Sequence, residues 1–456
     1  MRPFVRACVV LLAIVAGNSA FAGPAAPGSG TLPRIVVAFA NEPHAAPGPA
    51  GTTGSSYGGD GYRVSQSAVR QVHRVAATYA LREVTSWPIQ VLSMHCVVFE
   101  IGDGRPVAAV LAALSKDSGV MLAQPLQEFH TLTGADGGAS TVAGAGARTA
   151  AAASASTAAA ANTSTAAAAA TAAYNDPLYD LQTNMTALGI ARAHQRTQGA
   201  GVRVALIDTG VDAGHPDLRG RVVRTHSFLA TAAPSSAALR HGTAMAGVIA
   251  AVANNHIGIV GIAPLAQIEV FEACWQLAPA SDAAACNTFT LARALAAALA
   301  SGAPLVNLSF AGPADPLLTA LVQVGLKRGV AFVGAAAGAD APFPTAIPGV
   351  ITAAASEQQP LPPGALAAPA QHVLTLRPGT EYDFESGTSI AAAEISGVIA
   401  LLMSAAPGHL TTDSITAALR GSPGSAAQPL VDVNAALTRL DALQARAAVA
   451  THGTPL

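Results

Sequence analysis

The feature that most limits how this chain can fold is a tract near its middle, residues 134–173, with the sequence GADGGASTVAGAGARTAAAASASTAAAANTSTAAAAATAA. It has almost no large apolar side chain, so it cannot bury enough surface to offset the entropy lost on ordering. We expect it to be a linker. The 456 residues suffice for one sizeable domain and a smaller one. The linker therefore separates unit 34–133 from unit 174–442, which is followed by a tail at 443–456.

The first unit alternates strand-like and helix-like segments in the order β-α-β-β-α-β. The expected strands are 34–39, 89–101 (one or two strands) and 120–132, and the expected helices are 67–84 and 106–120. In the first helix, Val69, Val72 and Val75 fall near one face, which is the periodicity of an amphipathic helix. This element order predicts a small ferredoxin-like α+β fold.

The second unit has the pattern of an α/β protein with a parallel sheet flanked by helices. The expected strands are 201–210, 268–273, 304–310, 330–338 and 350–356, and the expected helices are 244–253, 289–302 and 317–329. The strands are nearly continuous apolar runs, as parallel strands buried on both faces should be. Ligands of such sheets bind beyond the carboxyl ends of the strands, and Asp208 lies at one of these ends.

Residues 1–22 have the pattern of a secretory signal peptide. Arg2 and Arg6 give a positive start, ACVVLLAIVA is a short apolar core, and AFA offers small residues for cleavage before Gly23. No later run is both apolar and long enough to span a bilayer. We therefore expect a secreted or periplasmic protein with no membrane span after signal removal. A net charge of -2, with 11% charged residues and no basic run, argues against nucleic acid as a partner.

Three cysteines remain after the signal peptide. Export would place them in an oxidising compartment, where disulfides persist. Cys274 and Cys286 bracket a loop and are able to pair, whereas Cys96 lies in an apolar strand-like run and is expected to be a buried thiol. No Cys/His spacing is typical of a zinc site.

Three short motifs carry the residue types needed for nucleophilic hydrolysis. LIDTGVDAGHPDL ends a strand at Asp208, RHGTAMAGVIA begins a helix near His241, and SGTSIAAAEISGVIALL begins another near Ser389. Taken singly, the aspartate fits an Asx-turn and the other two fit helix caps. Taken together they predict a catalytic site. A serine hydroxyl is a weak nucleophile until a histidine takes its proton, and a carboxylate must hold that histidine in the right tautomer.

These motifs resemble those of the subtilisin-like serine proteases, which carry DTG, HGT and GTS in the same chain order. The resemblance covers about residues 174–440. It implies a serine endopeptidase that hydrolyses peptide bonds through an acyl-enzyme, on a subtilisin-like fold. Ser389 would be the nucleophile, His241 the general base and then acid, and Asp208 the group that orients the histidine.

The same resemblance implies how substrates and the first unit would bind. NLSF resembles the edge strand that pairs with an extended substrate, so Ser309, Phe310 and Ala311 would line the cleft, although a plain core strand explains the run as well. The first unit looks like the family's inhibitory pro-domain, which would block the cleft through LQEFHTL. We expect maturation within 131–176, and a monomer whose partners are protein or peptide substrates and its own pro-domain.

No cofactor is required by this chemistry, but one segment resembles a calcium loop of some relatives. ANNHIGI at 253–259 and the nearby Asp217 would supply hard oxygen ligands, with Asn255 among them. An asparagine-rich turn explains the same residues equally well.

Two positions depart from the family pattern. Ala339 stands where an asparagine usually donates to the oxyanion, and losing one such donor costs roughly 2.7–4 kcal/mol. Ala393 stands where proline is usual, a milder change because alanine is an excellent helix former. The alternative function is therefore a catalytically impaired or inactive relative that binds peptides. A dinucleotide-dependent oxidoreductase is disfavoured, because the glycines of GAGVRVALID precede the strand, whereas phosphate-binding glycines follow it.

Overall fold

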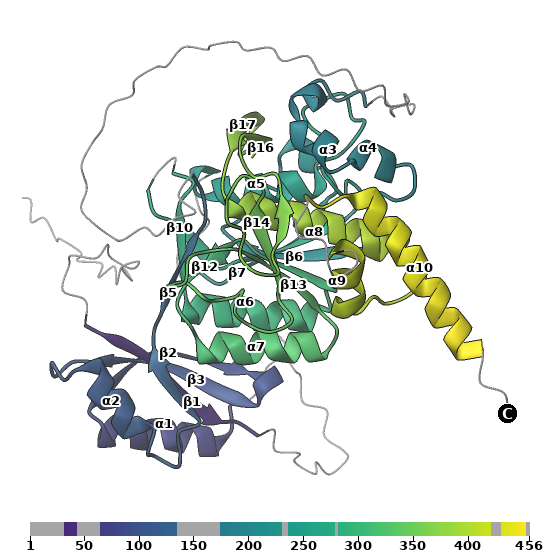
Figure 1. Cartoon of the computed structure of the whole chain (residues 1–456). Helices are drawn as coiled ribbons and strands as arrows, with labels where there is room; N and C mark the ends of the chain where they lie inside the picture. Colours follow the sequence, from purple (N-terminus) through teal and green to yellow (C-terminus); the bar gives the residue numbers. More distant parts are fainter. Residues whose placement is uncertain are drawn as a thin grey trace, which may run out of the picture.

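The computed structural model of this protein describes residues 32–42, 64–134, 174–229, 236–278, 281–420 and 430–452. The expected signal peptide and all but the first residue of the expected linker lie outside these ranges. The described residues form two units, a smaller N-terminal unit (32–134) and a larger C-terminal unit (174–452), seen at the bottom and the top of Figure 1.

The N-terminal unit is a four-stranded antiparallel sheet with two helices. Its elements are β1 (Arg34–Ala40), α1 (Gln66–Thr78), β2 (Leu81–Ile89), the 3₁₀ turn η1 (Gln90–Leu92), β3 (Met94–Ile101), α2 (Val107–Leu114), β4 (Leu122–Pro125) and β5 (Glu128–Thr131). The sheet order is β2-β3-β1-β4. The elements from β1 to β4 follow the expected β-α-β-β-α-β sequence.

Two boundaries in this unit differ from the sequence-based expectation. The helix expected at 67–84 ends at Thr78, because Ala80 takes a left-handed backbone conformation (φ 47°) and Leu81 begins a strand. The strand expected at 120–132 is two strands, since β4 stays in the sheet of this unit while β5 leaves it.

The C-terminal unit is built on a seven-stranded parallel sheet. The strands are β6 (Arg203–Asp208), β7 (Val222–Ser227), β8 (Gln267–Glu272), β9 (Cys274–Gln276), β10 (Ala284–Asn287), β11 (Leu305–Leu308), β12 (Phe310–Ala311), β13 (Ala331–Ala335), β14 (Ile351–Ala355), β15 (Leu366–Ala368), β16 (Val373–Arg377) and β17 (Glu381–Glu385). The helices are η2 (Tyr179–Leu181), α3 (Thr183–Ala187), α4 (Ile190–Ala193), η3 (Pro216–Leu218), η4 (Ser236–Leu239), α5 (Arg240–Ala250), α6 (Thr288–Ser301), α7 (Pro316–Lys327), α8 (Thr388–Ala405), α9 (Thr412–Arg420) and α10 (Val433–His452). The sheet order is β15-β14-β13-β11-β6-β8-β7, with every neighbouring pair parallel.

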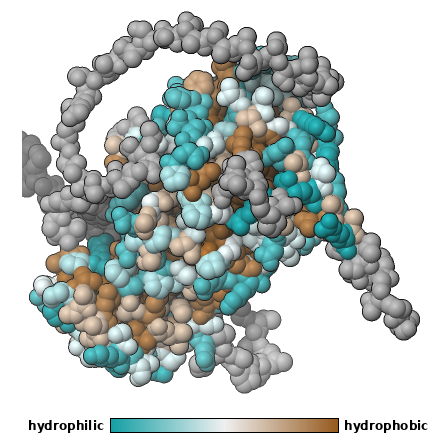
Figure 2. Space-filling view, in the orientation of Figure 1, coloured by the Kyte–Doolittle hydropathy of each residue, from teal (hydrophilic) through white to brown (hydrophobic). Residues whose placement is uncertain are grey.

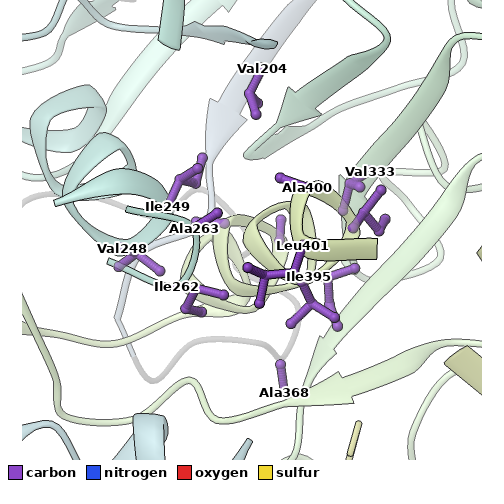
Figure 3. Packing of buried hydrophobic residues seen from close by; sticks show 14 of the residues in the cluster. Val204, Val248, Ile249, Ile262, Ala263, Val333, Ala368, Ile395, Ala400 and Leu401 are labelled. Carbon is purple, nitrogen blue, oxygen red and sulfur yellow. The ribbon is translucent and has the colours of Figure 1, made fainter. Parts of the chain in front are cut away.

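Helices cover both faces of this sheet, as the alternating sequence pattern predicts. On one face α8 is surrounded by residues of α5 and of the sheet, among them Ile249 and Val333, as Figure 3 shows. On the other face α6 and α7 pack on the sheet and continue into a cluster with Val36 and Cys96 of the N-terminal unit. The large unit is therefore an α/β domain, and the small unit lies on its α6 and α7 side (Figure 1).

A second, smaller sheet joins the two units. Its order is β12-β5-β10-β9, so β5 of the N-terminal unit lies between two strands of the C-terminal unit. It pairs antiparallel with both neighbours. Cys274 and Cys286 face each other across β9 and β10 and form a disulfide, while Cys96 is a buried free thiol, as its sequence context predicts.

The longest apolar helix is a core element. With 18 residues and a mean hydropathy of 1.6, α8 is long and apolar enough to cross a membrane, but 83% of it is buried inside the structure. On the face seen in Figure 2, apolar patches are interrupted by hydrophilic residues.

Candidate active site

Asp208 and His241 meet at the carboxyl edge of the large sheet. Asp208 is the last residue of β6, and His241 is the second residue of α5. His241 Nδ1 lies 2.7 Å from Asp208 Oδ1, and both side chains are buried. A carboxylate only accepts hydrogen bonds, so the imidazole proton lies on Nδ1 and the lone pair on Nε2.

The environment of His241 changes its basicity. Burial lowers the pKa of His241, but the charge and hydrogen bond of Asp208 more than offset this, and the charges of Glu385 and Asp282 add to them. The net result is a pKa above the ordinary histidine value. His241 Nε2 is buried and has no hydrogen-bond partner among the described residues.

Ser389 is the second residue of α8 and is buried beside a chain segment of the N-terminal unit. Its hydroxyl donates to the Ser309 carbonyl at 2.8 Å and accepts from the Leu132 N–H at 3.0 Å. The Ser389 backbone N–H donates to the Leu132 carbonyl at 3.3 Å. The structure thus joins Asp208 to His241, and Ser389 to Leu132, while the Ser389 hydroxyl points to Ser309 rather than to the imidazole.

Gly387 makes room for this segment. Its φ of 133° belongs to the region that favours glycine, and a Cβ there would collide with the Leu132 carbonyl oxygen. On the far side of Leu132, the Gly134 N–H donates to the Ser386 carbonyl at 2.8 Å. Residues 386–389 therefore lie alongside an extended chain segment, with Leu132 against Ser389 and Gly134 against Ser386.

The predicted substrate-binding residues lie along the same segment. Phe310 pairs with Thr131 and Ala311 with His130, so β12 is an edge strand used for main-chain pairing. Ser309 is buried, and its hydroxyl donates to the Ser389 carbonyl at 3.2 Å.

Two elements of this cleft have little local signal in the sequence. β10 pairs with β5 on the side opposite β12, and only the flanking cysteines hinted at a hairpin there. Phe129 of β5 is buried against Phe310 and Phe343, with ring centroids 6.4 Å and 5.4 Å away, in a space left open by Gly312.

A charged cluster lies behind His241. Buried Arg377 of β16 contacts Asp282 and Glu385 and lies 3.4 Å from Asp383, while Arg240 donates to Asp282 at 2.9 Å. Burial raises the pKa of Glu385 to about 7, against the opposing effect of Arg377. The cluster ties the turn before β10 to the residue preceding His241.

Ala339 and Ala393, the two departures from the family motifs, lie in different elements. Ala339 is an exposed turn residue after β13 and offers no side-chain donor. Ala393 continues α8 without interruption. Of the two departures, only alanine at 339 removes a hydrogen-bond donor.

The residues proposed for calcium hydrogen-bond to one another and to neighbouring backbone groups in this structure. Asn255 turns its amide nitrogen toward Asp217 Oδ1 at 2.7 Å, and its own oxygen accepts from the Ile257 N–H. The other carboxylate oxygen of Asp217 accepts from the Ile259 N–H at 2.9 Å. Burial raises the pKa of Asp217 to about 6. In the described part of the chain, no group of three or more His, Cys, Asp or Glu residues is arranged to hold a metal ion.

The geometry and the chain order of these residues agree with one family. The model of the subtilase family matches residues 199–433, which include Asp208, His241 and Ser389. The chain belongs to the subtilase family and is a serine-type endopeptidase.

Characterised relatives are proteases. Thermitase of Thermoactinomyces vulgaris is 31% identical over 244 residues, which are 50% of this chain and 85% of that protein. The thermophilic serine proteinase of Bacillus sp. (strain AK1) is 33% identical over 46% of this chain and 54% of its own length. Subtilisin E of Bacillus subtilis is 29% identical over 46% of this chain and 57% of its own. The chain thus spans little more than half the length of the last two.

A solved structure shows the same fold. Fervidolysin from Fervidobacterium pennivorans, described as a keratinolytic enzyme related to subtilisin, superposes with a TM-score of 0.64 at 21% identity. The superposition covers 91% of this chain and 62% of that one.

Proposed function

We propose that this protein is a secreted serine endopeptidase whose catalytic triad is Asp208, His241 and Ser389, and whose N-terminal unit is an inhibitory pro-domain cleaved after Leu132. The observation that carries the proposal is the contact of Leu132 with Ser389. The carbonyl oxygen accepts from the Ser389 backbone N–H at 3.3 Å, and the Leu132 N–H donates to Ser389 Oγ at 3.0 Å. This is how the acyl residue of a bond about to be cleaved would lie against its nucleophile.

The histidine is prepared to act as the general base. His241 Nδ1 donates to Asp208 Oδ1 across 2.7 Å, and Nε2 keeps its lone pair in a buried position without a partner among the described residues. In the reaction the Ser389 hydroxyl turns from the Ser309 carbonyl to Nε2 and gives up its proton there.

The acyl transfer follows from this proton movement. Ser389 Oγ attacks the carbonyl carbon, and negative charge grows on the carbonyl oxygen beside the Ser389 backbone N–H. His241 then passes its proton to the leaving amine. Water repeats the steps in reverse, which releases the acid and restores Ser389.

The N-terminal unit has the contacts expected of a pro-domain. Its β5 fills the cleft between β10 and β12, as an extended substrate would. Away from the cleft, Gln124 accepts from the Leu317 N–H at the start of α7, and Trp87 packs edge-on against Phe289 of α6. These contacts support a unit that covers the cleft until the Leu132–Thr133 bond is cut.

Ala339 is the observation that favours the second candidate, a relative that binds peptides without cleaving them. It supplies no oxyanion donor. The orphaned His241 Nε2 weighs against this candidate, because a binding module gains nothing from a buried, unpaired base.

The test is to label the purified protein with a fluorophosphonate probe. Labelling of the wild-type chain and its absence in Ser389→Ala are expected, together with casein cleavage and a new amino terminus at Thr133 in the wild type alone. A wild-type chain that neither reacts with the probe nor cleaves casein would overturn the enzymatic proposal. A mature protein with a different amino terminus would overturn the cleavage position.

A further inference from the structure

The strand that occupies the cleft places a threonine next to Leu132. In the ladders, His130 lies opposite Ala285 and Thr131 lies opposite Phe310. If the bond cleaved follows Leu132, as proposed above, Thr131 is the second residue before that bond, which we call the penultimate residue.

The Thr131 hydroxyl, and not a backbone carbonyl, accepts the hydrogen bond of a backbone N–H in this sheet. Thr131 Oγ1 accepts a hydrogen bond from the Ala284 N–H at 2.9 Å. It lies 3.4 Å from the Ala284 carbonyl and 3.5 Å from the Asp282 carbonyl, either of which takes its proton. Only 7% of Thr131 and 1% of Ala284 is exposed, so water has little access to these groups.

The Ala284 N–H has no alternative partner in the hairpin that carries it. The Leu277 N–H donates to the Ala283 carbonyl, so that pair is hydrogen-bonded. Hydrogen-bonded and non-bonded pairs alternate in an antiparallel ladder. Ala284, opposite Gln276, therefore falls at a non-bonded pair and turns its N–H away from β9, toward β5.

The turn at residues 281–283, which precedes Ala284, is held in place by hydrogen bonds and ion pairs. The Asp282 carboxylate accepts from Arg240 at 2.9 Å and contacts buried Arg377. The Ala283 N–H donates to the Ser281 hydroxyl at 3.1 Å. Because the turn is anchored on both sides, Ala284 cannot easily rotate to find another acceptor.

We infer that this peptidase selects peptides with a hydroxyl side chain, threonine or serine, at the penultimate position, and that the selecting groups are the Ala284 N–H and the Ala284 and Asp282 carbonyls. The inference rests on the proposed function. A valine has the shape of threonine but leaves the buried Ala284 N–H without an acceptor. The complex then loses the full cost of removing that N–H from water, which is larger than the net gain from an ordinary hydrogen bond.

Four peptide amides test the selection in the processed wild-type enzyme: Phe-His-Xaa-Leu with Thr, Val, Ser or Ala as Xaa, each carrying a fluorogenic leaving group. We expect kcat/KM to fall about tenfold from Thr to Val and by a similar factor from Ser to Ala, since both steps remove one hydroxyl. The two ratios separate the hydroxyl from the methyl group. Equal rates for Thr and Val would overturn the inference and leave the proposed function standing.

The full chain offers the same comparison in cis. Thr131→Ser should release the Thr133 amino terminus at a rate close to that of the wild type, whereas Thr131→Val should be about tenfold slower. Equal processing of the two variants would count against the inference.

A third measurement does not depend on catalysis. In a Ser389→Ala background, amide hydrogen exchange at Ala284 should be slow with the native Thr131 and after Thr131→Ser. It should be several-fold faster after Thr131→Val, because only a hydroxyl protects that N–H. Unchanged protection with valine would overturn the inference. Failure of the proposed function would instead appear as a wild-type chain that neither labels with fluorophosphonate nor processes itself, whatever the exchange result.

Discussion

The Nδ2 group of Asn184 donates a hydrogen bond of 2.8 Å to Glu394 Oε1, and both side chains are buried. Asn184 Oδ1 and Glu394 Oε2 are also buried, without a partner among the described residues. Burial raises the pKa of Glu394 well above its ordinary value, which favours the neutral acid. A neutral carboxyl is a donor as well as an acceptor, so it can satisfy both groups of the asparagine amide.

This pair predicts how stability depends on pH. A carboxyl whose pKa is raised by folding stabilises the protein below the pKa of the unfolded chain. As pH rises above that value, the free energy of unfolding decreases by about 1.4 kcal/mol per pH unit until the folded pKa is reached. Glu394→Gln keeps the shape and the hydrogen bond from Asn184 Nδ2, and has no titrating proton. We expect it to unfold at a higher temperature than the wild type at pH 8, with a smaller difference at pH 5.

Calorimetry in a catalytically silent Ser389→Ala background measures this effect without self-digestion. Glu381→Gln, on the exposed start of β17, is the matched control and should leave the unfolding temperature unchanged at both pH values. A Glu394→Gln protein that is less stable at pH 8 would mean that the ionised carboxylate is the stabilising form.

The large sheet could be predicted from the sequence because its signal is local. Strands buried on both faces are continuous apolar runs, so β6, β8, β11, β13 and β14 were each expected where they occur. β7, with the sequence VVRTHS and mostly exposed residues, forms the edge of the sheet and was missed. The β16–β17 hairpin was also missed, since β17 is mostly exposed and depends on its partner strand.

The candidate site was predictable as motifs but not as a set of contacts. Asp208, His241 and Ser389 could be named from three short stretches because each lies at the end of a strand or the start of a helix. The pairing of β5 with β10, and of Asn184 with Glu394 at a separation of 210 residues, depends on how distant segments pack. No local pattern encodes such contacts.

The disulfide gives a prediction about the cleft. Cys274 and Cys286 fasten β9 to β10, the strand that pairs with an extended chain in the cleft. Replacing both with serine should lower stability by about 2–5 kcal/mol and raise KM for peptides more than it lowers kcat. Steady-state kinetics with the fluorogenic peptides above measure the split. A double variant with wild-type KM would show that β10 holds its position without the disulfide.

Ala339 gives a prediction about turnover. The Ser389 backbone N–H is the one oxyanion donor identified beside Leu132 among the described residues, and Ala339 adds none. An added side-chain donor would stabilise the charge that grows in the transition state, so Ala339→Asn should raise kcat by up to about 10²–10³ with little change in KM. Ala339→Leu, which adds bulk without a donor, is the control and should not raise kcat. An unchanged kcat in Ala339→Asn would mean that another group already fills the role.

The raised pKa of His241 predicts the acidic limb of the pH–rate profile. Catalysis needs the neutral imidazole, so kcat/KM should fall as pH decreases through a midpoint above 6.5, the ordinary histidine value.

Glu385 is one of the charges that favour the imidazolium. Glu385→Gln removes that charge, so the pKa of His241 should decrease and the limb should move to lower pH. Glu381→Gln on the same hairpin is the matched control, and its profile should overlay that of the wild type. A Glu385→Gln limb that stays in place or moves to higher pH would show that this carboxyl is neutral over the working range, and that Asp208 alone sets the basicity of the imidazole.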